Sequence, residues 1–287
     1  MRAPLAVVGA LALGARAVPA QLEQPIYNAA AFYNVGGNLP VYPCGPRVDR
    51  QGSGSASAAC TDAGVSFAYA VGVRGGVIQA SAAVAGGAFV PGVGNRWESD
   101  VNGLWSDRLT VTGGSAASVS FTLEWAGTAR ASKSYDPTAY SYASGGFVWG
   151  FMAGQAGGPF EPRYQYTNYL PVTAADGGGV HRGPQSGTVH DVRTFVIPLV
   201  GSSGVDFAYT LAAGSEVVCT GLCSGPFSAS AYSDAGSARL VAVGFKDAAG
   251  NDVTSSVRYA FQNGTQIVPA AVPEPATWAL VAAGGVP

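Results

Sequence analysis

The sequence predicts an all-β protein folded as an antiparallel β-sandwich. A jelly-roll-like arrangement of the strands is one alternative that the sequence leaves undecided. Three observations predict the sandwich. Apolar residues recur at every second position in many segments, which is the period of a half-buried strand. Glycine accounts for 41 of the 287 residues, and charged residues for only 11%. No stretch of a dozen residues combines the helical period with capping residues.

Seven segments carry the alternation expected of strands. The clearest is 118–125, where Val119, Phe121, Leu123 and Trp125 alternate with serine, threonine and glutamate. That pattern predicts one buried and one wet face. The remaining segments are 65–73, 147–151, 195–199, 205–211, 240–245 and 257–261.

Turn-forming residues separate these segments. A Gly-Gly pair lies within 112–115, and 247–252 has the composition of a connection between two hairpin strands. Three consecutive glycines at 177–179 predict a flexible loop that extends through 181–187. The segments 105–111 and 232–243 resemble each other, which either two similar halves or similar strand sequences would explain.

Residues 1–20 have the order of a secretory signal peptide. Arg2 precedes the apolar run 5–13, and small residues suited to cleavage follow. We therefore expect export, a mature chain that begins at Gln21, and a β-sandwich body over 21–268.

The C-terminal segment 269–287 contains Val272, Pro273, Glu274 and Pro275, followed at once by the apolar run 276–280. This order resembles the sorting tail of PEP-CTERM proteins. The resemblance implies recognition by an exosortase-like sorting enzyme and an association with biofilm or exopolysaccharide. As a helix, the residues after Pro275 would span about 18 Å, against about 30 Å of bilayer hydrocarbon. We therefore expect transient membrane contact and release, in a secreted or cell-surface protein.

The four cysteines allow three disulfide pairings in an exported chain. We favour Cys44–Cys60 and Cys219–Cys223, because each pair is local in sequence. A zinc site is less favoured because one of these pairs is too widely spaced. We expect neither a metal nor a cofactor.

The sequence contains no recognisable group of catalytic residues. The net charge is −2 and the basic residues form no cluster in the sequence, so we expect no nucleic-acid partner. Only His181 and His190 are present, and His190 and its neighbour Asp191 would point to opposite faces of a strand. The candidate acids for a glycosidase pair are Glu98, Asp100, Glu124 and Glu161, among which spacing cannot choose.

Aromatic residues crowd the middle of the chain, and Tyr140, Tyr142 and Tyr166 are the candidate ligand-binding residues. Exposed rings can stack on sugars, whereas the competing interpretation places such rings in the core. The predicted function is therefore a non-catalytic exported protein of the cell surface or extracellular matrix. The alternatives are a carbohydrate-binding module and, less favoured, a secreted hydrolase.

Overall fold

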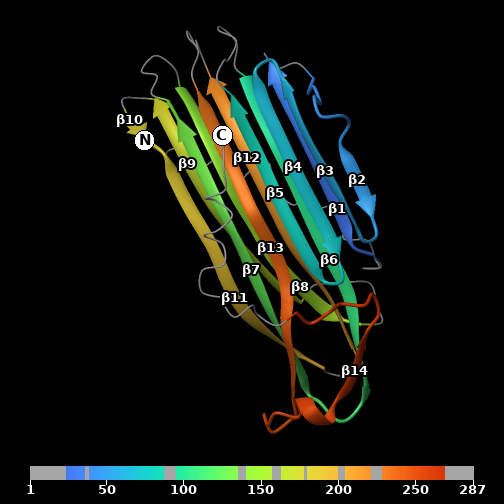
Figure 1. The fold of residues 1–287 in the computed structure, drawn as a ribbon. Helices are drawn as coiled ribbons and strands as arrows, with labels where there is room; N and C mark the ends of the chain where they lie inside the picture. The colour runs from blue at the N-terminus through green and yellow to red at the C-terminus, as the bar shows by residue number, and fades with distance from the viewer. Residues whose placement is uncertain are drawn as a thin grey trace, which may run out of the picture.

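The computed structural model describes residues 24–35, 39–86, 95–134, 140–156, 163–177, 180–199, 204–220 and 228–268. These residues form two antiparallel sheets packed face to face, as Figure 1 shows. The predicted antiparallel β-sandwich is therefore confirmed. The predicted signal peptide and the sorting tail lie outside the described residues.

The first sheet, sheet A, has the strand order β10-β9-β8-β12-β6-β1-β2, and β14 also pairs with β6. Its strands are β10 (Val180–Arg182), β9 (Tyr164–Gly177), β8 (Tyr140–Gln155), β12 (Gly204–Thr220), β6 (Asn95–Gly113), β1 (Ile26–Val35), β2 (Val48–Gln51) and β14 (Arg258–Phe261).

The second sheet, sheet B, has the order β11-β7-β13-β5-β4-β3. Its strands are β11 (Gln185–Pro198), β7 (Ser118–Lys133), β13 (Ala229–Lys246), β5 (Val77–Gly86), β4 (Val65–Arg74) and β3 (Gly54–Asp62). The single 3₁₀ turn of the described chain is η1 (Thr254–Ser256). No described helix is long and apolar enough to cross a membrane.

The core lies between the sheets and follows the predicted alternation. In β7, the four alternate apolar residues from Val119 to Trp125 are completely buried. Phe121 of sheet B packs against Phe207 of sheet A, with ring centroids 4.7 Å apart. The two resembling segments lie in β6 and β13, in opposite sheets that share this one core.

All seven predicted segments lie wholly or largely within strands, but two predicted connections are wrong. Residues 247–252 do turn tightly, since the Asp247 carboxylate accepts the backbone N–H groups of Ala249 and Asn251. The chain then crosses to sheet A, where β14 pairs with β6 instead of β13. A turn motif fixes the local reversal but not the partner of the strand that follows.

The predicted loop 181–187 is also wrong, because it contains β10 and the start of β11. Gly187 belongs to an edge strand with β7 as its neighbour. A Cβ atom at this position would lie 3.0 Å from Val172 Cγ2 and 3.2 Å from Leu170 Cδ1. The glycine therefore makes room for β9 across the sandwich and does not mark a loop.

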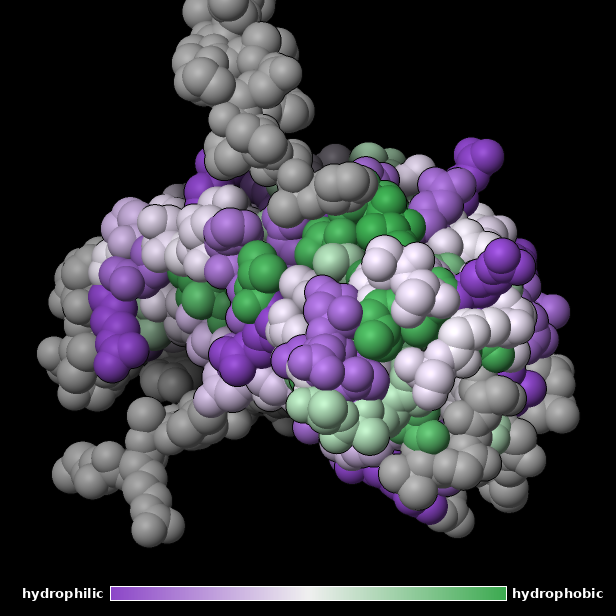
Figure 2. Space-filling view, turned by 90° about the horizontal axis from the view of Figure 1, so that it is seen from below, coloured by the Kyte–Doolittle hydropathy of each residue, from purple (hydrophilic) through white to green (hydrophobic). Residues whose placement is uncertain are grey.

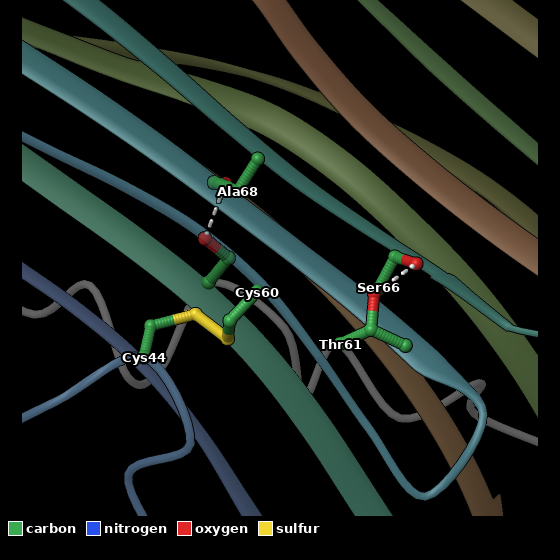
Figure 3. Close-up of a disulfide and its surroundings, with 6 residues drawn as sticks. Cys44, Cys60, Thr61, Ser66 and Ala68 are labelled. Carbon is green, nitrogen blue, oxygen red and sulfur yellow. Dashed lines mark hydrogen bonds between the residues drawn. A yellow bond between two sulfur atoms is a disulfide. The ribbon is translucent and has the colours of Figure 1, made fainter.

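The predicted Cys44–Cys60 disulfide is confirmed, with the two Cα atoms 5.4 Å apart (Figure 3). Cys44 lies in the connection between β1 and β2 of sheet A, and Cys60 lies in β3 of sheet B. The bond therefore joins the two sheets along one edge of the sandwich. Cys219 is also disulfide-bonded, whereas Cys223 lies outside the described residues.

One end of the sandwich is closed by the segment 262–268, at the end where β14 lies. The buried Asp107 carboxylate accepts the backbone N–H groups of Arg108, Asn263 and Thr265, at 2.7, 2.7 and 3.0 Å. Trp105 Nε1 donates to the Thr265 hydroxyl at 2.7 Å. Seen from this end in Figure 2, hydrophobic residues appear as small patches between hydrophilic ones.

Candidate functional site

The outer face of sheet A carries an open groove over β6, β8, β9 and β12, with about 470 Å³ of empty space including the part open to solvent. Its floor is one row of paired residues. Gly214 of β12 pairs with Gly146 of β8, which pairs in turn with Pro171 of β9. The two neighbouring glycines have no side chains to cover the backbone. The outer face of the sheet is therefore hollow at this row.

Three carboxyl groups stand along one side of the groove. Glu98 of β6 is the direct pairing partner of Glu216 of β12, and Asp100 lies two residues further along β6. Like charges placed directly opposite each other destabilise a sheet. Arg96 offsets this repulsion, because Nη2 lies 2.6 Å from Glu98 Oε2 and Nε lies 2.5 Å from Glu216 Oε1.

Burial changes the ionisation of these groups. Burial and, to a smaller extent, the neighbouring Asp100 together raise the pKa of Glu98 to about 10 against the opposing effect of Arg96. Burial likewise raises the pKa of Glu216 to about 7, again opposed by Arg96, and it raises the pKa of Asp100. At neutral pH, Glu98 is therefore protonated and shares a hydrogen bond with Asp100.

The other side of the groove is less polar. Tyr169 of β9 is 46% exposed and pairs with Val148 of β8. Ser144 lies between the two sides, where its hydroxyl is 3.0 Å from that of Thr173. The groove therefore combines an exposed ring with carboxyl and hydroxyl groups, which is the combination that recognises the apolar and polar faces of a sugar.

The structure separates the three predicted ligand-binding tyrosines. Tyr142 lies on the outer face of sheet A and hydrogen-bonds to Glu216 beside the groove. Tyr166 points between the sheets, where its hydroxyl donates to Asp191 at 2.7 Å and its ring lies 5.5 Å from that of Phe195. Tyr140 belongs to β8, but its side chain lies outside the described residues. Tyr142 and Tyr166 therefore do not share one binding surface.

The acids considered for a glycosidase pair also separate. Glu98 and Asp100 meet in the groove, whereas Glu124 lies on sheet B in an ion pair with Arg239 at 2.8 Å, and Glu161 is outside the described residues. Glu216 was not among the sequence candidates. Glu216 lies beside Glu98 because β6 pairs with β12, and no local sequence pattern predicts the register of that pairing.

The described residues contain no group of three or more histidine, cysteine or acidic side chains arranged to hold a metal ion. The predicted separation of His190 from Asp191 is confirmed. His190 lies 3.5 Å from Glu124 on the outer face, whereas Asp191 accepts Trp149 Nε1 at 2.8 Å between the sheets. No protein-family model, curated protein or solved structure matches this chain.

Proposed function

We propose that this chain is an exported, non-catalytic protein of the cell surface or extracellular matrix that binds a polysaccharide in the groove of sheet A. The observation that carries the binding proposal is the groove itself, with Tyr169 facing the carboxyl groups across a floor of glycine. The two terminal signals in the sequence support export, and the Cys44–Cys60 disulfide is compatible with an oxidising compartment.

The chemistry of the groove suits a sugar unit with an apolar C–H face and several hydroxyl groups. The exposed ring of Tyr169 would pack on the C–H face of one sugar unit. Asp100 and Glu216 would accept hydrogen bonds from its hydroxyl groups, whereas the proton of Glu98 stays in the hydrogen bond to Asp100.

The same groove contains the arrangement that favours the second candidate, a glycoside hydrolase. Two opposed carboxyl groups with different pKa values are typical of such enzymes. Here, however, the Arg96 guanidinium lies within 2.6 Å of both Glu98 and Glu216. Both carboxyl groups are therefore held by Arg96, which does not suit an acid and a nucleophile acting on a glycosidic bond, and we favour binding without cleavage.

The test is a glycan array followed by calorimetry with the purified chain. Replacing the exposed ring (Tyr169→Ala) should weaken binding about threefold to tenfold, from the energy of one aromatic contact. Tyr42→Ala is the matched control, since Tyr42 is 38% exposed but lies outside sheet A's groove.

Two results would contradict the proposal. One is a bound glycan whose affinity is the same for Tyr169→Ala and the parent chain. The other is the release of reducing ends from that glycan by the parent chain but not by Glu98→Gln, which would favour the hydrolase instead.

A further inference from the structure

A lysine and an aspartate are buried together between the two sheets, away from the groove. The side chain of Lys133, the last residue of β7, is 1% exposed, and that of Asp176 in β9 is 2% exposed. Lys133 Nζ donates to a carboxylate oxygen of Asp176 and to the backbone oxygen of Ser134 at 2.9 Å. The contact joins sheet B to sheet A.

Small apolar side chains lie next to this pair along and across the strands. Buried alanines lie two residues before each partner, Ala131 in β7 and Ala174 in β9, and Ala229 of β13 pairs with Lys133. Moving two charges into such a region costs several kcal/mol per ion before their attraction offsets it. The chain has one other lysine, Lys246, and that residue is exposed.

One further polar group faces the same place. Ser141 of β8 is the direct pairing partner of Asp176 and is completely buried. Its hydroxyl oxygen has no hydrogen-bond partner among the described atoms. A buried unsatisfied hydroxyl is rare and costs about 1–3 kcal/mol. An acceptor formed beside it would satisfy it.

From this arrangement we propose that Lys133 and Asp176 condense to an amide, a covalent isopeptide cross-link between β7 and β9. In this step a proton passes from the Lys133 ammonium to the carboxylate oxygen of Asp176 to which it donates, which leaves an amine and a carboxylic acid. The amine nitrogen then attacks Cγ, and the C–N bond forms. The C–O bond breaks, and its oxygen leaves with two protons as one water molecule.

The contact between Lys133 and Asp176 lowers the activation barrier of this step. Reactants held in contact react as if at an effective concentration of about 10⁵ M or more, and water excluded from the site cannot reverse the reaction easily. The Ser141 hydroxyl is placed to donate to the carbonyl oxygen of the new amide, as a positioning residue. The product would hold the two sheets together under reducing conditions, which the disulfides would not survive.

The test is the intact mass of the reduced, denatured protein. We expect a mass about 18 Da below that of the reduced sequence, one water lost. Lys133→Arg keeps the charge but cannot form the amide, so it keeps the water that the parent loses. Its mass should therefore exceed that of the parent by about 46 Da, whereas the substitution alone adds about 28 Da. This difference does not depend on where the leader is cleaved. Lys246→Arg is the matched control and should differ by about 28 Da only.

Two further measurements do not depend on how well Lys133→Arg folds. Asp176→Asn should yield the same final mass as the parent chain, because ammonia leaves where water left before. After trypsin digestion, peptides 131–163 and 164–182 should remain joined, and fragment spectra distinguish this product from the uncut peptide of equal mass. A parent chain at its full reduced mass, with Lys133 cleaved normally by trypsin, would overturn the proposal whatever the groove binds.

Discussion

Replacing Glu98 by glutamine should stabilise the protein at neutral pH and leave its stability unchanged in acid. The folded pKa of Glu98 is about 10, against an ordinary value of 4.5. Between these two values the folded chain keeps the proton and the unfolded chain loses it. The contribution of Glu98 to stability is therefore complete below pH 4.5 and decreases as pH rises, by about 1.4 kcal/mol per pH unit.

The magnitude at pH 7 follows from the interval above 4.5, which gives about 3 kcal/mol. Glutamine is neutral in both states, so Glu98→Gln does not incur this loss. Its amide can also donate to Asp100, as the protonated carboxyl group does. The free energy of unfolding of Glu98→Gln should therefore exceed that of the parent by about 3 kcal/mol at pH 7 and equal it at pH 4.

The assay is urea unfolding followed by tryptophan fluorescence, at intervals from pH 4 to pH 8. Glu124→Gln on sheet B is the control, because it removes an acid that is ion-paired to Arg239 and should give no gain at neutral pH. If the difference between Glu98→Gln and the parent is the same at pH 4 and pH 7, burial does not control the ionisation of Glu98, and the account of the groove is wrong.

Four further predictions test the fold and the location of the protein. Replacing Cys44 and Cys60 by alanine frees a loop with a sequence separation of 16 residues, and urea unfolding should show a loss of about 3 kcal/mol; an unchanged midpoint would contradict this. Asp107→Ala leaves one buried and two partly buried backbone N–H groups without their acceptor, so a loss of about 3 kcal/mol is expected. A loss below about 1 kcal/mol would show that the closing segment is held otherwise. Tyr166→Phe removes the hydrogen bond to Asp191 and should cost about 1 kcal/mol without changing glycan affinity, whereas weaker binding at equal stability would restore Tyr166 as a ligand residue. Proteomics of spent medium should find the chain without residues 1–20, and a cytosolic chain with its leader intact would refute export.

The candidate site shows where local prediction stops. Glu98 and Asp100 are candidates by residue type alone, and their sequence neighbours give no reason to prefer them over Glu124. Glu216 joins them because β6 pairs with β12 in a register that places it opposite Glu98. A shift of that register by one residue would turn Glu216 to the other face of the sheet.

The tyrosines also show that the sequence does not determine which face of a sheet a side chain occupies. None of the predicted strands contains Tyr142 or Tyr166, although both residues lie in long strands of sheet A. The sequence pattern around them located neither residue on a strand. It could not say which of them faces the second sheet, because both faces of β8 carry apolar residues. The contacts of Tyr166 with Asp191 and Phe195 come from a strand in the other sheet.

The sequence by itself determined the strand class, the alternating core positions and the local Cys44–Cys60 disulfide. Each of these depends on residues close together in the chain, where backbone geometry sets the period and a short loop sets the reach. The tertiary structure alone decided the acidic groove and the burial of Lys133 against Asp176. Both depend on which distant strands pair and which face each strand turns inward, and packing over the whole sandwich fixes that choice.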